Sequence, residues 1–120
     1  MKRLFIAAKK EALERCFTES QMGTSRVVST EEFYRNPSVY SDVEFIFSTW
    51  GMPQFSEEEI RRYFPNLKAV FYAAGSVAAF ARPFFHCNVR IFSAWAANAI
   101  PVAEFTAAQI ILANKGYFQM

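Results

Sequence analysis

The turn Ala73-Ala74-Gly75-Ser76 is the segment of this chain best suited to hold an anion. Its small residues allow backbone N–H groups to approach a carboxylate or phosphate oxygen closely, and the Ser76 hydroxyl adds a further donor. A lone glycine can also serve only to turn the chain out of a strand, and the local spacing by itself favours that structural role. Ala74, Gly75 and Ser76 are therefore candidate anion-binding residues.

Four further polar or aromatic residues could contribute to a small-molecule site. Asn98 can donate and accept hydrogen bonds, although bonding to nearby backbone is the simpler role. Trp50, beside the flexible Gly51, can close over a substrate or pack at an edge, and the sequence favours neither role. His86 is the only histidine. It lies in a predicted helical stretch away from the other candidates, which indicates that its side chain is at the surface. Glu104 complements a helix dipole and has no histidine nearby with which to form a catalytic pair.

Five apolar runs of strand length alternate with segments long enough for helices. The runs are Leu4-Ala8, Arg26-Val28, Val43-Thr49, Leu67-Ala73 and Val89-Phe92. This alternation predicts an α/β domain with a parallel sheet of about five strands and helices on both faces. The loops Ser48-Pro53, Ala73-Val77 and Ser93-Ile100 then follow carboxyl ends of strands, where parallel sheets bind ligands.

Local signals predict where several helices begin and end. Lys9 to Glu19 carries an apolar face, and Ser56 with Glu59 forms a capping box whose helix Pro65 ends. The run Val77-Cys87 has a helical pattern with a predicted break at Pro83. Asn88 then stands where a left-handed residue is needed.

The last helix is predicted to begin at Pro101 and is apolar around nearly its whole circumference as far as Ala113. A five-stranded domain can cover one side of such a helix, so the other side implies another domain or subunit. We therefore expect a domain over residues 1–100, a linker helix over residues 101–120, and a chain cut at a domain junction.

Composition narrows the partners and the compartment. The chain has 120 residues, 52% of them hydrophobic, and a formal net charge of +2 from mixed charges, so no basic stripe predicts binding to nucleic acid. Fourteen Phe, five Tyr and two Trp exceed what a small core usually hides. Cys16 and Cys87 with one His cannot form a disulfide framework or a zinc site, so no metal is expected. No signal peptide and no uninterrupted apolar stretch of membrane length is visible, which predicts a cytoplasmic protein without a membrane partner.

Two blocks resemble the NAD-dependent D-isomer-specific 2-hydroxyacid dehydrogenases. The blocks are Leu67-Lys68-Ala69-Val70-Phe71-Tyr72-Ala73-Ala74-Gly75 and Asn98-Ala99-Ile100-Pro101-Val102-Ala103-Glu104-Phe105-Thr106, and the second matches the family pattern N-x-x-x-V-A-E. The resemblance covers residues 43 to 115, whereas residues 1 to 42 share only the strand-helix rhythm. It departs from the family at Val77-Ala78-Ala79-Phe80, where many members carry an acidic residue.

The resemblance implies a flavodoxin-like substrate domain, joined to a Rossmann domain that follows the chain's end. By this resemblance, the amides of Ala74, Gly75 and Ser76 hold the carboxylate of a 2-hydroxy or 2-oxo acid, beside Asn98. Val102 and Thr106 face NAD or NADP, which the absent domain mainly binds. The catalytic histidine, its carboxylate partner and the substrate arginine lie in that absent half, so no catalytic residue is expected here. The complete enzyme is expected to be a homodimer.

The competing hypothesis is a stand-alone flavodoxin-like binding or interaction module without catalysis. A receiver-type version needs acidic residues after the first strand and an aspartate ending the third, where Ala8-Lys9-Lys10 and Thr49-Trp50 stand instead. A flavin-binding version needs a phosphate loop after the first strand, which Ala-Ala-Lys-Lys cannot form. A non-catalytic interaction module stays open.

Overall fold

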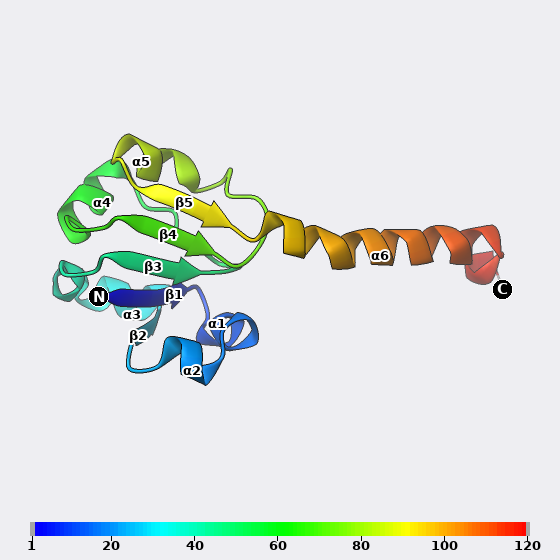
Figure 1. Cartoon of the computed structure of the whole chain (residues 1–120), viewed down its shortest axis with the longest axis horizontal. Coiled ribbons are helices and arrows are strands. Elements are labelled where there is room, and N and C mark those ends of the chain that lie inside the picture. Colours follow the sequence, from blue (N-terminus) through cyan, green and yellow to red (C-terminus); the bar gives the residue numbers. More distant parts are fainter. Residues whose placement is uncertain (1, 120) are drawn as a thin grey trace.

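A five-stranded, all-parallel sheet forms the centre of the protein, which we describe from a computed structural model over residues 2–119. The strand order is β2-β1-β3-β4-β5 (Figure 1). The strands are β1 (Arg3–Ala7), β2 (Arg26–Ser29), β3 (Phe45–Ser48), β4 (Ala69–Tyr72) and β5 (Arg90–Ser93). Each lies in one of the five predicted runs to within one residue, and the parallel pairing confirms the predicted α/β, flavodoxin-like fold.

One face of the sheet is fully covered and contains the main core. Four short elements cover it: α3 (Thr30–Arg35), η1 (Pro37–Tyr40), α4 (Glu57–Tyr63) and α5 (Ala81–His86). Buried side chains from the strands, such as Ile46 and Val70, pack there against Phe33, Ile60 and Phe84 from these helices. Burial of this apolar area is what holds the helices to the sheet.

The other face is covered only in part. The helices α1 (Lys10–Cys16) and α2 (Glu19–Met22) pack over β1 and β2, where Phe5 and Leu13 are buried. Four phenylalanines cross this face strand by strand, with ring centroids 4.8 to 5.1 Å apart in stacked pairs: Phe5, Phe47, Phe71 and Phe92. No helix lies in front of β3, β4 and β5 in the view of Figure 1. We call the side of these three strands that carries Phe45, Phe47, Phe71 and Phe92 the open face.

Capping signals agree with the helix boundaries, with two corrections. The Ser56 hydroxyl accepts from the Glu59 amide while Glu59 accepts from the Ser56 amide, as predicted, and α4 ends before Pro65. Asn88 adopts the predicted left-handed conformation, with φ of 60°. The predicted break at Pro83 is wrong, because Pro83 lies in the first turn of α5, where its missing N–H has no helical partner to lose. The predicted helix from Lys9 to Glu19 is two shorter helices, α1 and α2.

The final helix α6 spans Trp95–Asn114 and is followed by η2 (Tyr117–Gln119). It begins earlier than predicted, with Pro101 inside it rather than at its start. The expectation that the domain covers one side of it is also wrong, since none of its residues is buried. It runs away from the sheet as a rod, and the molecule is 57 Å long (Figure 1). By length and composition alone this helix could cross a membrane, so the predicted absence of a membrane partner stays a prediction.

Candidate functional site

The loops that leave β1, β3, β4 and β5 are tied together at the carboxyl edge of the sheet. The Ala73 amide donates to the Ser48 carbonyl at 2.8 Å, and the Ala94 amide donates to the Tyr72 carbonyl at 3.0 Å. The Ala8 amide reaches the Gly51 carbonyl at 2.8 Å. These bonds hold the three predicted loops at one edge, in the position where parallel sheets bind ligands.

Ser93, the last residue of β5, connects the anion-binding turn to the start of α6. Its hydroxyl donates to the Gly75 carbonyl at 2.6 Å, with a weaker approach to the Ala74 carbonyl at 3.2 Å. The same oxygen accepts from the Trp95 amide at 3.1 Å. One hydroxyl therefore fixes two adjacent carbonyls of the turn relative to the first residue of α6. Ser93 was not among the predicted site residues, since a serine at a strand end carries no local signal of such a role.

Gly75 lies directly against Asn98, which occupies the first turn of α6. A Cβ atom added at Gly75 would stand 2.9 Å from the Asn98 Nδ2 atom, closer than real Cβ contacts come. A larger residue at this position would have to displace the Asn98 side-chain amide. The structure therefore brings together Gly75 and Asn98, two candidates that lie 23 residues apart in the sequence.

The turn leaves several backbone donors without an internal partner. Within residues 2–119, no hydrogen bond is formed by the amides of Ala74, Gly75 or Ser76. The Ser76 hydroxyl is exposed and accepts only from the Ala78 amide at 3.3 Å. Unpaired N–H groups in a turn can bind carboxylate or phosphate oxygens where solvent reaches them, and Gly75 and Ser76 are the more accessible of the three residues, since Ala74 is buried.

Arg82 adds a positive charge on the outer side of this turn. Ser76, Ala81 and Arg82 line one shallow hollow together with Phe85. Arg82 makes no ion pair among the residues that the structure describes, so its guanidinium is available to an anion. Arg82 could not be predicted as a site residue, because only the turn of the chain between Ser76 and α5 brings it to this position.

The other predicted site residues lie at or near the same edge with fewer contacts. Trp50 is exposed in the loop after β3, beside Gly51, whose φ is 85°. Val102 and Thr106 lie one turn apart on the exposed α6, and the Thr106 hydroxyl donates to the Val102 carbonyl at 2.8 Å. No hydrogen bond or aromatic contact within residues 2–119 joins Trp50 to the Gly75 turn, and Val102 and Thr106 lie farther along the rod.

Among the described residues, the loops after β1, β3, β4 and β5 at this edge carry no histidine or carboxylate that could move a proton. His86 lies instead on α5, where its Nδ1 atom is 2.9 Å from a Glu57 carboxylate oxygen. The hydrogen bond from His86 holds the pKa of the Glu57 carboxyl below its usual range. Burial raises the pKa of Tyr72, which ends β4. Residues 2–119 also contain no cluster of three His, Cys, Asp or Glu that could hold a metal.

The geometry therefore defines a candidate binding edge. The Ser76 hydroxyl and the Arg82 guanidinium line one hollow and can hold an anion there. The Gly75 amide and the Asn98 side chain lie next to this hollow without lining it.

No model of a known protein family matches this chain, and no curated protein sequence matches it significantly.

Proposed function

We propose that this chain is the substrate-side part of an NAD(P)-dependent D-2-hydroxyacid dehydrogenase, which interconverts a 2-hydroxy acid and a 2-oxo acid. The proposal is supported chiefly by the contact of Gly75 with Asn98. Because of this contact, the amide-rich turn and the start of the N-x-x-x-V-A-E helix lie beside each other. The turn holds the substrate carboxylate through the amides of Ala74, Gly75 and Ser76, and Asn98 bonds the C2 oxygen.

The residues present fit only a small part of a dinucleotide. Val102 and Thr106 offer an apolar contact and a hydroxyl on an exposed helix, which suits the edge of a nicotinamide ring. The chain's four glycines form no G-x-G-x-x-G turn to hold a pyrophosphate. When bound, NAD(P) supplies the hydride transfer. This chain binds and orients the acid, and a separate domain holds the nucleotide and the proton-transferring groups.

The first test uses the native reading frame through Met120. We expect it to continue into a strand and a glycine-rich turn within about 30 residues. The complete product should oxidise NADH or NADPH with a 2-oxo acid and form the D-isomer of the 2-hydroxy acid. An in-frame stop at this point, with no partner gene product that restores turnover, favours the competing interaction module.

The second test uses the 120-residue chain itself. Titration with oxamate, a 2-oxo acid analogue, should shift the amide NMR signals of Ala74, Gly75 and Ser76 with a Kd in the range of about 1–10 mM. Asn98→Ala should weaken this binding several-fold, whereas Asn114→Ala, an exposed asparagine at the far end of the same helix, should not. Equal shifts with chloride at the same concentration would show a general anion site and contradict the proposal.

A further inference from the structure

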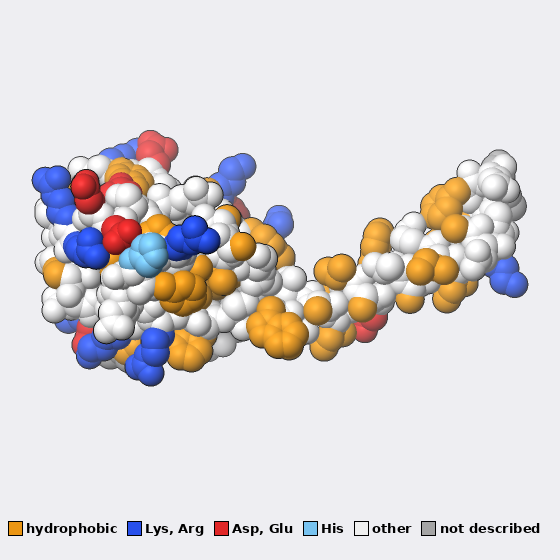
Figure 2. Space-filling view, turned by 90° about the horizontal axis from the view of Figure 1, so that it is seen from above, with side chains coloured by type: hydrophobic (Ala, Val, Ile, Leu, Met, Phe, Trp, Pro, Cys, Tyr) orange, Lys and Arg blue, Asp and Glu red, His pale blue; other side chains and the backbone are white. Residues whose placement is uncertain are grey.

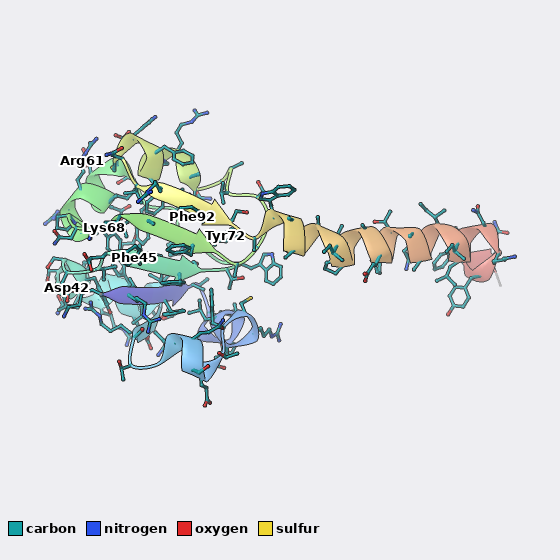
Figure 3. All side chains as sticks on the ribbon, viewed as in Figure 1. Asp42, Phe45, Arg61, Lys68, Tyr72 and Phe92 are labelled. Atoms are coloured by element: carbon teal, nitrogen blue, oxygen red, sulfur yellow. The ribbon has the colours of Figure 1, made fainter. Side chains whose placement is uncertain are left out.

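A polar hollow of about 340 Å³ lies at the amino edge of the sheet, where β1 and β2 begin. Figure 3 shows Asp42 beside the start of β1, whereas Tyr72 ends β4 at the opposite edge, from which α6 leaves. We call this cavity the amino-edge hollow. Six residues line it: Lys2, Arg3, Thr24, Ser25, Arg26 and Asp42.

The amino-edge hollow holds the whole excess of positive charge in the chain. Three cations and one carboxylate line it, which gives a net charge of +2. The full chain has 13 basic and 11 acidic residues, so the remaining ten of each sign cancel. The helix α6 carries no Lys or Arg along its length, in contrast to the domain (Figure 2). Glu44 is bonded by Lys68 and does not line the hollow, so it does not offset this charge directly.

Both arginines of the hollow are held in place by backbone carbonyl groups. The Arg3 guanidinium donates to the Gln21 carbonyl at 3.0 Å and has no ion pair among residues 2–119. The Arg26 guanidinium donates to the Val39 carbonyl at 2.8 Å and lies over the Tyr40 ring, 5.1 Å from its centroid. A carbonyl fixes the direction of a guanidinium without neutralising it, so both cations are already oriented.

Most donors of the hollow stay available to a ligand. Asp42 is the one anion that lines it, 2.7 Å from the Arg26 guanidinium and 3.4 Å from the Lys2 ammonium. Each guanidinium has five N–H donors, and the bonds above use only one or two of them. Within the described residues, no hydrogen bond is formed by the Thr24 amide or by the hydroxyls of Thr24 and Ser25.

We propose that the amino-edge hollow binds the phosphate group of a small phosphate monoester. Its two excess positive charges match the dianion that such a group forms near neutral pH, since the second pKa of a phosphate monoester is about 6. Guanidinium groups present pairs of donors that suit phosphate oxygens, and hydroxyls and a free amide complete the set. The volume lies at the lower end of the range for small-molecule sites, about 300–1,000 Å³, which suits a small metabolite.

This site is separate from the carboxylate site proposed at Gly75 and does not depend on the proposed function. The test is an NMR titration of the 120-residue chain with glycerol 3-phosphate at low salt. The amides of Thr24, Ser25 and Arg26 should shift with a Kd of about 1 mM, at lower concentration than the amide of Gly75. Shifts at Gly75 without shifts at Thr24 would place the phosphate at the carboxyl edge and overturn the proposal. Equal shifts with sodium chloride at the same ionic strength would overturn it as well.

Two variants remove a single charge from the hollow. Lys2→Gln and Arg3→Gln should each weaken the binding of glycerol 3-phosphate about three- to ten-fold, because the site is partly open to solvent. The matched control is Arg15→Gln, since Arg15 is exposed on α1, has no ion pair within residues 2–119 and does not line the hollow. An equal loss in this control would mean general charge attraction and would contradict the site. Urea unfolding shows whether each variant keeps its fold.

Removal of the internal carboxylate should have the opposite effect. Asp42→Asn frees Arg26 and Lys2 from their ion pairs, so the affinity for glycerol 3-phosphate should rise at least about three-fold. Glu14→Gln removes an exposed carboxylate that does not line the hollow, and it should leave the affinity unchanged. An affinity that does not rise in Asp42→Asn would exclude the phosphate from these cations.

A phosphate monoester is also the headgroup of phosphatidic acid, so the two sources are compared directly. The free ester should bind, and any sedimentation of the chain with vesicles of phosphatidylcholine and phosphatidic acid should be the same for Arg3→Gln. Sedimentation that Arg3→Gln abolishes, without binding of the free ester, would assign the hollow to a lipid headgroup and overturn the small-molecule ligand.

Discussion

At the scale of single residues, the close approach of Gly75 to Asn98 can be tested by adding one methyl group. Gly75→Ala should displace the Asn98 side-chain amide, because the added methyl group would stand 2.9 Å from Nδ2, and the cost should stay below about 1 kcal/mol since this amide ends a flexible side chain. In the Asn98→Ala background the same change should cost less, since the atom that it meets is gone. Urea unfolding of the four proteins measures this coupling and cancels the effect of alanine on the unfolded chain. Additive effects would mean that the two residues do not touch.

Arg82 is the only charged side chain in the hollow that it shares with Ser76. Arg82→Gln should weaken oxamate binding about three- to ten-fold, because it removes a charge-assisted hydrogen bond from a partly exposed site. Arg62→Gln, on the exposed surface of α4, is the control and should leave binding unchanged. The affinity for Arg82→Gln should also depend less on salt, and an unchanged affinity would place the carboxylate elsewhere.

Four carboxylates stabilise the folded state through charged partners. A hydrogen-bonded cation lowers the pKa in each case: Lys10 for Glu32, Arg26 for Asp42, Lys68 for Glu44 and His86 for Glu57. Because the folded pKa values lie below the unfolded ones, this stability is present above about pH 4.5 and is lost as the pH falls through the folded values.

The thermal midpoint should therefore fall between about pH 5 and pH 3, as these groups are protonated. Glu44→Gln should make that fall shallower, since it removes one linked proton. Glu14→Gln, which changes an exposed carboxylate without an ion pair in residues 2–119, should leave the slope as it is. A midpoint that is flat across this range would contradict the role of the four pairs. All four side chains are partly exposed to solvent, so the effect should also shrink in high salt.

At the scale of elements, the capping box of α4 is a local determinant of a short helix. Ser56→Ala removes the acceptor of the Glu59 amide and should lower the free energy of unfolding by about 1 kcal/mol. The control is Ser41→Ala, because Ser41 is exposed and its hydroxyl has no hydrogen bond in the described chain. Equal losses in the two variants would mean that the cap contributes nothing. Urea unfolding measures both.

The same kind of local information explains which elements were predictable. The five strands could be predicted from the sequence, because apolar runs such as the one at Phe45–Ser48 are short and bounded by turn residues. The helix α3 was missed, although Ser29 and Glu32 form a capping box of the same pattern as that of α4. The start of α6 was misplaced because Pro101 was interpreted as a first helical residue, a position that proline favours but does not always occupy.

The candidate site was predictable only in part. Gly75 and Asn98 were identified from residue type and from the resemblance, but their contact depends on the pairing of β4 with β5. Ser93 and Arg82 carry no signal in the sequence, because their roles arise from which loops the sheet brings together. The open face could not be predicted either. An apolar run predicts that burial of both faces of a strand is favourable. It does not predict whether a covering helix is present.

At the scale of the whole molecule, a compact domain carries a rod that has almost no contact with it. An isolated helix of 20 residues is only marginally stable in water, since most helical stability in proteins comes from packing. The amides of α6 should therefore exchange with deuterium far faster than those of the central strands β1 and β3 when the chain is dilute and monomeric.

Hydrogen–deuterium exchange with mass spectrometry on a dilute sample measures this difference. The amides of β1, an interior strand of the sheet, serve as the internal reference. Protection of α6 at high dilution equal to that of β3 would show that the rod is already packed in the monomer, which neither its exposure nor its direction in the structure allows.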